Sequence, residues 1–362
     1  MTRMLRLPRK TAVTVIEASV PGEGSHPLSA VRQAPHHRDP LSGRGQRPPR
    51  LPEGGAITLL PDASAFFIDA VLAGGGDVVP LGPETRGLMW LSDRRSDELF
   101  HILQTHPGIT WVQLPWAGVD AFADLLAHYA PAGPAPLFTS AKGAYSEPVA
   151  EHAVTLVQAT LRELAPKARA ARWAERRTGI SLYGAHVVIV GAGGIATEII
   201  RLLAPFRVSI TIVRRSATPL PGADRTVTVD QLHEVLPMAD VLILAAASTH
   251  ETHLLIGAAE LALLPATAVL VNIARGALID QDALFDALRG ELLWGAGLDV
   301  TSPEPLDADH PLWREPRCVI TSHSADTPQM TEPLLAHRIT ENVHAFLGDS
   351  RFVGIVDPAA GY

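Results

Sequence analysis

The sequence is poor in cysteine and lacks an unbroken apolar run, and each shortage excludes a class of protein. Cys318 is the one cysteine among 362 residues, so an intrachain disulfide framework and a zinc cage of several thiolates are excluded. The most apolar long stretch, 255–274, is interrupted by a glutamate, a proline and an asparagine. It fits a helix, a turn and a buried strand better than a membrane span. His250 and His253 have a metal-site spacing, but no third ligand is evident. We therefore predict a cytoplasmic protein with no membrane contact and no metal.

Positive charge is scarce outside the first 50 residues. Residues 1–50 carry nine Lys or Arg against three acidic residues, whereas the remainder carries 21 against 35, a net charge of -14. A body with this charge repels a phosphate backbone, so we predict no nucleic-acid partner. The first 50 residues also contain seven prolines and no sustained periodicity. We therefore interpret residues 1–54 as a disordered leader.

From residue 56 onward, short apolar runs alternate with longer stretches of helical periodicity. This alternation is typical of parallel sheets that helices cover on both faces. The later runs are continuously apolar, as in central strands buried on both sides. We predict two α/β domains, one over 55–146 with a helical tail at 329–362, and the other over 147–328. The runs are AITLL, GLMWL, TWVQL and PLFTS in the first domain, and HVVIV, VSITIV, DVLILAAA, AVLVNIA, LWGAGLDV and CVITS in the second.

A glycine-rich loop directly follows the run HVVIV. Gly191, Gly193 and Ala196 form a GxGxxA pattern. The first glycine permits a tight turn, the second lets a pyrophosphate approach the backbone, and the small third residue lets helix pack on strand. A strand before the loop and a helix after it are the context that this motif requires. We therefore predict a dinucleotide site in which the amides of Gly194 and Ile195, at a helix N-terminus, contact phosphate.

The end of the next strand indicates which dinucleotide fits. In this fold an acidic residue there binds the ribose 2′-hydroxyl of NAD, whereas arginine accommodates the 2′-phosphate of NADP. The run VSITIV ends in Arg214, Arg215 and Ser216, without an acidic residue. Two guanidinium groups and a hydroxyl are suitable donors to a phosphate dianion, although a solvated surface pair is the simpler alternative. We predict NADP(H) as the preferred cofactor, with NAD(H) as the alternative.

Three later segments place charged side chains after successive strands of the second domain. The carboxyl ends of parallel strands line one crevice, so these side chains are expected to converge beside a nicotinamide. Singly, each has a simpler explanation, such as a surface ion pair or a strand cap. Together they indicate a catalytic site. The residues are Arg275 in NIARGALID, Asp299 and Glu304 in LDVTSPEPL, and His323 in VITSHSADTP.

These motifs resemble those of the D-isomer-specific 2-hydroxyacid dehydrogenases. The resemblance covers about residues 55–345, because WVQLPWAGVD, VAEH, the glycine loop and the three later segments follow that family's order and spacing. It implies an α/β fold of two doubly wound parallel-sheet domains. The flavodoxin-like substrate domain comprises 55–146 and 329–362, and the Rossmann nucleotide domain comprises 147–328.

The resemblance also implies residue roles. Arg275 binds the substrate carboxylate and polarises the carbonyl, and His323 is the acid/base. Glu304 orients the imidazole and favours its protonated form. Asp299 contacts the nicotinamide. The family's histidine usually follows a proline, whereas Ser322 precedes His323 in this chain.

The predicted reaction is the NADPH-dependent reduction of a small 2-oxo acid to the D-2-hydroxy acid, as in glyoxylate/hydroxypyruvate reductases. The amides of Ala117 and Gly118 are expected to bind the substrate carboxylate, and the arm 165–184 is expected to join a homodimer. One alternative is a phosphoglycerate dehydrogenase, although 39 residues after His323 leave no room for its regulatory domain. Another is a dinucleotide-sensing scaffold that resembles the C-terminal-binding corepressors.

Overall fold

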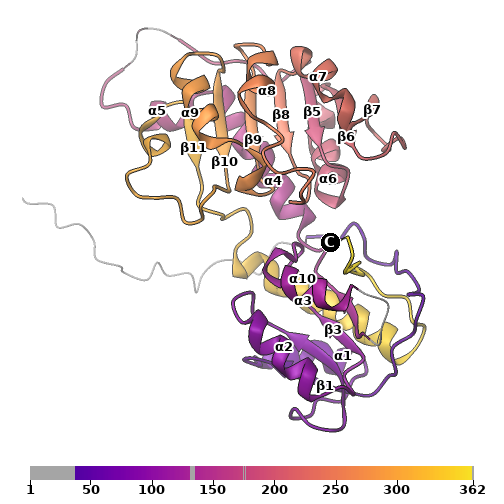
Figure 1. Cartoon of the computed structure of the whole chain (residues 1–362). Coiled ribbons are helices and arrows are strands. Elements are labelled where there is room, and N and C mark those ends of the chain that lie inside the picture. Colours follow the sequence, from indigo (N-terminus) through magenta and orange to yellow (C-terminus); the bar gives the residue numbers. More distant parts are fainter. Residues whose placement is uncertain (1–36, 131–134, 174, 176, 361–362) are drawn as a thin grey trace, which may run out of the picture. The chain divides into compact units, whose positions relative to one another are not determined.

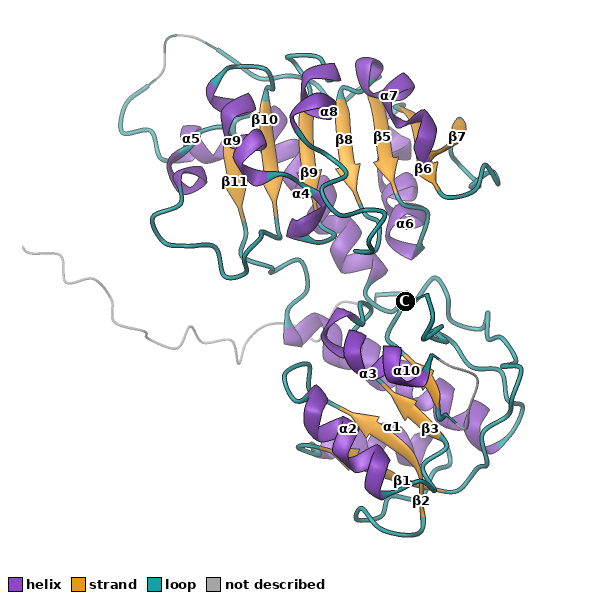
Figure 2. Ribbon diagram, viewed as in Figure 1, coloured by secondary structure: helices purple, strands orange, loops and turns teal. Residues whose placement is uncertain are grey.

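A computed structural model describes residues 37–130, 135–173, 175 and 177–360. Within these ranges the chain forms two sheets in which every strand pair is parallel, with helices packed on them (Figure 1 and Figure 2). The predicted α/β class is therefore confirmed. None of the helices in the described ranges is long and apolar enough to cross a membrane.

The first sheet has the order β1-β2-β3-β4. A parallel bridge between Ile57 and Val78 adds a short extended segment on the outer edge of β1. With that segment, the chain order across the sheet is the flavodoxin-like order 2-1-3-4-5. The predicted helical tail is present and packs on the first helix, where the Thr340 hydroxyl donates to the Ala70 carbonyl over 2.9 Å. The elements are β1 (Ala56–Leu60), α1 (Ala65–Ala73), β2 (Thr85–Trp90), α2 (Ser96–Thr105), β3 (Trp111–Gln113), α3 (Ala123–Tyr129), β4 (Leu137–Thr139) and α10 (Pro328–Leu347).

The second sheet has seven strands in the described chain, in the order β11-β10-β9-β8-β5-β6-β7. This is the Rossmann order, and the direction of strand addition reverses between β5 and β8. The sequence runs predicted all of these strands except β7. The elements are α4 (Ser146–Leu161), α5 (Leu164–Ala168), β5 (His186–Val190), α6 (Gly194–Leu203), β6 (Ser209–Arg214), β7 (Arg225–Thr228), α7 (Leu232–Val235), β8 (Val241–Leu244), α8 (Ala258–Leu263), β9 (Val269–Asn272), α9 (Gln281–Arg289), β10 (Gly295–Leu298) and β11 (Cys318–Ile320).

Strand β5 shows why the central runs are continuously apolar. Val187 and Ile189 belong to the core that includes residues of α4 and α6, whereas Val188 and Val190 belong to the core on the other face, which includes residues of α8 and α9. All four side chains are at most 2% exposed. Because both faces are covered, every position of the strand favours an apolar residue.

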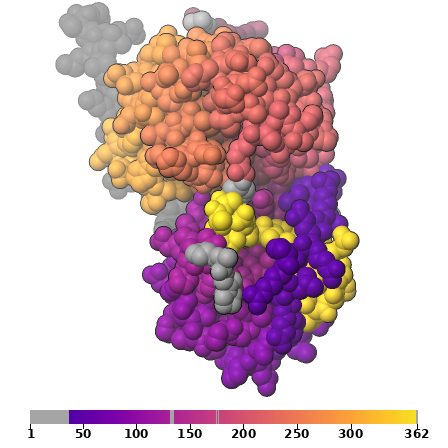
Figure 3. Space-filling view, turned by 45° about the vertical axis from the view of Figure 1, so that its right-hand side comes forward, coloured from indigo at the N-terminus to yellow at the C-terminus, as the bar shows by residue number. Residues whose placement is uncertain are grey.

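The structure differs from the predicted disordered leader over residues 37–54. The segment 37–46, which we call the strap, packs against the C-terminal part of the chain. Asp39 forms an ion pair with Arg338 of α10, and Gln46 forms an antiparallel bridge with Phe352. The indigo atoms of the first described residues lie beside the yellow C-terminal atoms in Figure 3. Partners so distant in sequence leave no local periodicity, and the remainder of the predicted leader, 1–36, lies outside the described residues.

The ion pair between Asp39 and Arg338 is fully buried, with side-chain exposures of 1% and 0%. Removing one partner of a buried pair leaves an uncompensated charge away from water, which destabilises a protein by about 3–5 kcal/mol. Asp39→Ala is therefore expected to lower the free energy of unfolding by about that amount in urea titrations. Arg47→Ala is the matched control, since it removes an exposed arginine next to the strap. Equal effects of the two substitutions would contradict a structural role for the buried pair.

Candidate active site

One cavity of about 1670 Å³ brings together nearly all of the predicted site residues. Pockets for small ligands typically measure about 300–1,000 Å³, so this volume has room for a dinucleotide together with a small substrate. Glu304 is the predicted residue that is absent from the cavity wall, and it contacts His323 instead. The predicted residues in the wall are Ala117, Gly118, Gly191, Gly193, Gly194, Ile195, Arg214, Arg215, Ser216, Arg275, Asp299 and His323.

The glycine loop connects β5 to α6 and has the shape that a pyrophosphate requires. Gly191 has φ of 117°, and a Cβ there would lie 2.5 Å from the Ala245 carbonyl oxygen, so other residues are excluded on both grounds. A Cβ at Gly193 would meet no atom within 4 Å, which leaves this backbone open to the cavity. Helix α6 begins at Gly194, so unsatisfied amides face the same space. The residues therefore fit the phosphates of a dinucleotide.

The two arginines lie beside this loop because β5 and β6 are neighbours in the sheet. Val190 pairs with Val213, and the Gly191 amide donates to the Val213 carbonyl over 2.8 Å. Arg214 and Arg215 follow immediately, at the end where the ribose of a bound dinucleotide lies. The Nη1 of Arg214 donates to the Thr218 carbonyl over 3.2 Å. The predicted cationic end of the cavity is therefore present.

His323 and Glu304, which are predicted to act together in acid/base catalysis, lie in contact. The His323 Nδ1 lies 3.0 Å from the Glu304 Oε2. The hydrogen bond to Glu304 raises the pKa of His323 against the opposing effect of burial. Burial favours the neutral form of Glu304, but the hydrogen bond and charge of His323 outweigh it and lower the pKa of that carboxyl. A protonated imidazole is thereby stabilised at the cavity wall.

The backbone at His323 has an unusual conformation. Ser322 and His323 both have φ of 51°, in the left-handed region. A proline ring holds φ near -65°, so proline cannot occupy position 322 in this conformation. The serine that replaces the family's usual proline is therefore compatible with the observed loop.

Asp299 holds the histidine loop in place. Its carboxylate accepts hydrogen bonds from the Thr321 hydroxyl over 2.6 Å and from the Ser324 and Ala325 amides over 2.9 and 3.1 Å. Burial raises the pKa of this carboxyl, but hydrogen bonds from His152, Thr321 and Ser324 outweigh burial and lower it. Asp299 lies in the cavity wall, as predicted, and its oxygens also anchor the loop that carries His323.

Arg275 meets the segment 117–120 of the other sheet. Its Nε and Nη2 donate to the same Asp120 carboxylate oxygen over 2.9 and 2.8 Å, and its Nη1 donates to the Ala274 carbonyl over 2.7 Å. Gly118 lies directly under the guanidinium, because a Cβ at that position would overlap the Arg275 Nη2. The structure therefore brings the predicted carboxylate-binding residues together and adds an acidic partner that the sequence did not reveal.

Gly118→Ala is expected to impair substrate binding without unfolding the protein. The added methyl group displaces the flexible end of Arg275, so charge-assisted hydrogen bonds to a carboxylate are lost and KM rises by about tenfold or more. Steady-state kinetics with a 2-oxo acid and thermal melting provide the measurement. Gly82→Ala is the matched control, because its Cβ would meet one atom at 3.9 Å. An unchanged KM at position 118 would show that Arg275 does not bind substrate there.

The cavity wall also contains residues for which the sequence predicted no role. Asp120 and Lys142 come from loops of the first sheet, and Asp326 follows the histidine loop. Burial raises the pKa of Asp326. These three residues are identified by their proximity in space to Arg275 or to Arg215. The spacing of residues along the sequence does not indicate that proximity. Among the described residues, no cluster of three or more His, Cys, Asp or Glu has the geometry to hold a metal ion.

Comparison with known proteins agrees with this geometry. Residues 154–325 match the model of the D-isomer specific 2-hydroxyacid dehydrogenase, NAD binding domain. An uncharacterized protein in the proB 3′ region of Corynebacterium melassecola is 35% identical over 70% of this chain and 84% of its own length. A glyoxylate reductase of Aeropyrum pernix is 32% identical over 58% of this chain and 65% of its own length, slightly less than two thirds.

The fold has close relatives among solved structures. A D-isomer specific 2-hydroxyacid dehydrogenase from Xanthobacter autotrophicus Py2, in complex with NADPH and MES, superposes with a TM-score of 0.72. It is 25% identical, and the match covers 85% of this chain and 100% of that one. The sheet orders, the glycine loop and the family match all point to the same family. The chain belongs to the D-isomer-specific 2-hydroxyacid dehydrogenase family and is an oxidoreductase that uses a nicotinamide dinucleotide.

Proposed function

We propose that this protein reduces a small 2-oxo acid of the glyoxylate or hydroxypyruvate type to the D-2-hydroxy acid, with NADPH as the preferred cofactor. One observation carries the proposal. Arg275 and His323, whose Nδ1 contacts Glu304, face the same cavity as the glycine loop and the paired arginines. A carboxylate clamp, a proton donor and a dinucleotide site are the three parts that this reaction needs.

The substrate carboxylate binds at Arg275 in this proposal. Planar N–H groups of the guanidinium suit a carboxylate, and two of them already hold the Asp120 carboxylate. Substrate therefore replaces Asp120 or shares the guanidinium with it. Ala117 and Gly118 lie in the adjacent wall, where their amides complete the carboxylate site. The positive charge of Arg275 also polarises the substrate carbonyl.

Proton delivery falls to His323. The reduced nicotinamide, when bound, supplies the hydride to the carbonyl carbon. The carbonyl oxygen then needs a proton, and the protonated imidazole provides it near neutral pH. Glu304 holds the Nδ1 side of the ring, so the Nε2 side is the one directed to substrate. Asp299 keeps the histidine loop in place and lies beside the nicotinamide.

The preference for NADPH rests on Arg214, Arg215 and Ser216. They provide guanidinium and hydroxyl donors at the ribose end of the cavity, and the end of β6 itself carries no acidic residue to bind a 2′-hydroxyl. Asp230, just after the neighbouring strand β7, is the nearest acidic residue along that edge in the described wall. The Xanthobacter structure holds NADPH, and the Aeropyrum relative is named a glyoxylate reductase. The cofactor of the first protein and the activity of the second support the proposal.

An assay of purified protein tests this function. Glyoxylate, hydroxypyruvate, pyruvate, oxaloacetate and 3-phosphohydroxypyruvate are each offered with NADPH and with NADH, and oxidation is followed by absorbance. The highest kcat/KM is expected for glyoxylate or hydroxypyruvate with NADPH, and chiral chromatography of the hydroxypyruvate product is expected to give the D isomer. Turnover restricted to 3-phosphohydroxypyruvate with NADH would identify a phosphoglycerate dehydrogenase instead. Cofactor binding without turnover of any of these acids would support a sensing scaffold.

We also propose a homodimer formed through the arm 165–184. Within that arm Trp173 is 93% exposed, an arrangement that leaves a large apolar surface in water unless a partner covers it. Light scattering at micromolar concentration is expected to give twice the chain mass. A monomer under those conditions would overturn the proposal.

A further inference from the structure

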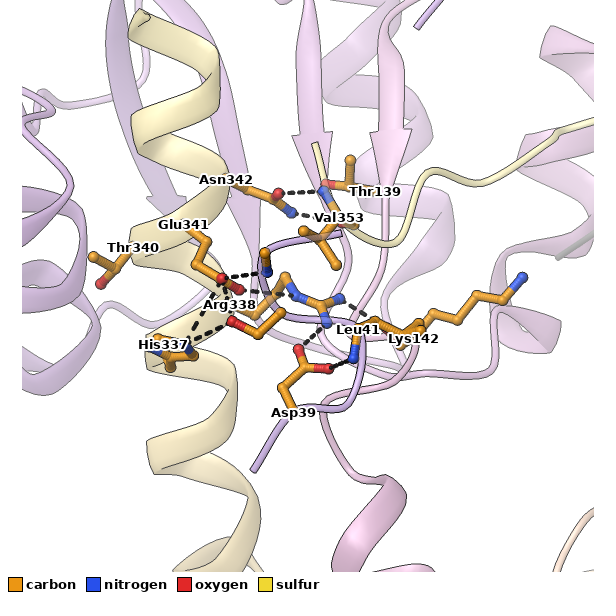
Figure 4. Close-up of polar contacts among 12 residues, drawn as sticks. Asp39, Leu41, Thr139, Lys142, His337, Arg338, Thr340, Glu341, Asn342 and Val353 are labelled. Atoms are coloured by element: carbon orange, nitrogen blue, oxygen red, sulfur yellow. Dashed lines mark hydrogen bonds and ion pairs between the residues drawn. The ribbon is translucent and has the colours of Figure 1, made fainter. Parts of the chain in front are cut away.

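The loop 140–143 between β4 and α4 is held by a buried arginine. The Nη1 of Arg338 donates to the Ser140 and Lys142 carbonyls, each over 2.9 Å, and Arg338 is paired with Asp39 of the strap. Figure 4 shows the contacts of the Arg338 guanidinium with Asp39 and Lys142. The backbone at Lys142 is therefore fixed from α10 and, through Asp39, from the strap.

The strap also closes the other side of this loop. Gly143 has φ of 93°, and a Cβ there would lie 2.5 Å from the Leu41 Cγ, so the Leu41 side chain fills the space beside the glycine. Pro40 lies beside Gly194 of the glycine loop, since a Cβ on Gly194 would be 3.4 Å from the proline Cγ. Residues of the strap thus lie against both the Lys142 loop and the phosphate-binding loop.

The Lys142 side chain lies in the same cavity wall as the paired arginines. In Figure 4 it extends away from Arg338, and Lys142 lies in the wall of the cavity that also contains Arg214, Arg215 and Ser216. Burial lowers the pKa of the Lys142 ammonium, and the positive charge of Arg215 lowers it further. Two like charges that face one cavity repel each other, and an anion bound near both relieves that repulsion. The arrangement is suited to a phosphate.

We propose that Lys142 binds the 2′-phosphate of the dinucleotide together with Arg215, and that the strap positions it through Asp39 and Arg338. This inference rests on the proposed preference for NADPH. Lysine contributes a compact point charge, whereas the arginines contribute planar donor groups, so the three cations surround one phosphate from two different loops. The site thereby combines the end of β6 with a loop of the first sheet.

Dissociation constants of NADPH and NADH for the full-length protein and for Lys142→Met test the proposal, with cofactor fluorescence as the readout. The substitution is expected to weaken NADPH binding by about ten- to a hundredfold and NADH binding by less than about threefold. Adenosine 2′,5′-bisphosphate, as a competitor, is expected to lose affinity in parallel with NADPH, whereas 5′-AMP is not. Lys142→Arg is expected to restore most of the NADPH affinity. Arg289→Met is the control for the loss of one positive charge, because Arg289 lies on α9, outside the cavity wall.

Equal weakening of NADPH and NADH would overturn the inference, because it would place Lys142 at the pyrophosphate or in a structural role. An unchanged NADPH affinity would overturn it as well. A wild-type protein that prefers NADPH but is insensitive to Lys142→Met would leave the proposed function intact and exclude this residue alone. A wild-type protein that prefers NADH would overturn the cofactor preference itself, and the role of Lys142 with it.

Discussion

Replacing His323 with asparagine is expected to lower kcat/KM for the reduction of a 2-oxo acid by about a hundred- to ten-thousandfold, which is the usual contribution of a general acid. The amide of asparagine does not ionise near neutral pH, so it cannot deliver the proton. The dissociation constant of NADPH is expected to change little, because the phosphate-binding loop lies on a different strand end. Pre-steady-state and steady-state absorbance measurements distinguish the two effects.

His233→Asn is the matched control for this experiment. His233 also contacts a glutamate, with 2.7 Å between its Nε2 and the Glu260 Oε1, but it lies outside the cavity wall. Loss of a histidine–glutamate pair as such is therefore separated from loss of the proton donor. Near-normal turnover of His323→Asn would exclude the assigned role.

The pH profile provides a second check of the same pair. The hydrogen bond that His323 donates to Glu304 raises the pKa of His323, with burial in opposition, so the imidazole stays protonated to higher pH than a free histidine. Reduction requires the protonated form, so kcat/KM is expected to be level below that raised pKa and to fall as pH rises through it. Glu304→Gln removes the carboxylate charge, and the fall is then expected to begin at lower pH. A profile unaffected by Glu304→Gln would show that another group donates the proton.

The sheets could be predicted because their strands are buried on both faces. Central strands such as β5 and β8 have no exposed positions, so their apolar runs are continuous and stand out from the helices around them. Strand β7 was missed for the opposite reason. It lies at the edge of the second sheet, carries the residues RTVT and has one buried position, so it gives no such run.

The site could be predicted in part because parallel strands end at one edge. Arg275 and His323 follow different strands, and that topology alone places them in one cavity. Asp120 ends the motif WVQLPWAGVD, but the motif did not indicate that its carboxylate pairs with Arg275. Lys142 follows the first sheet's strand β4, and no motif there indicates that it shares a cavity with Arg215. The burial of Arg338 could not be predicted either, because a charged residue in an amphipathic helix is normally assigned to its exposed face.

Arg214→Asp combined with Arg215→Ala is expected to reverse the preference between NADPH and NADH. Each charge-assisted hydrogen bond to the 2′-phosphate contributes roughly 1.5 to 3 kcal/mol, so the loss of two lowers kcat/KM for NADPH by about a hundredfold or more. The new carboxylate repels the phosphate and accepts a hydrogen bond from the ribose 2′-hydroxyl of NADH, so NADH use improves. Measurement of kcat/KM for both cofactors with glyoxylate gives the ratio.

The geometry of the cavity predicts how this change divides between binding and turnover. Arg214 ends β6 and Arg215 follows it, whereas His323 follows β11 at the far edge of the sheet. The arginines therefore act on the ribose end and not on the reacting carbonyl. KM for NADPH is therefore expected to carry most of the effect, with kcat at saturating cofactor changed little. The sequence offers a close control in Arg94, Arg95 and Ser96, a second Arg-Arg-Ser segment outside the cavity wall. The same two substitutions there, Arg94→Asp with Arg95→Ala, are expected to leave the cofactor ratio unchanged. If the ratio moves equally in both double variants, overall charge decides cofactor affinity, and the arginines at the end of β6 do not bind the phosphate.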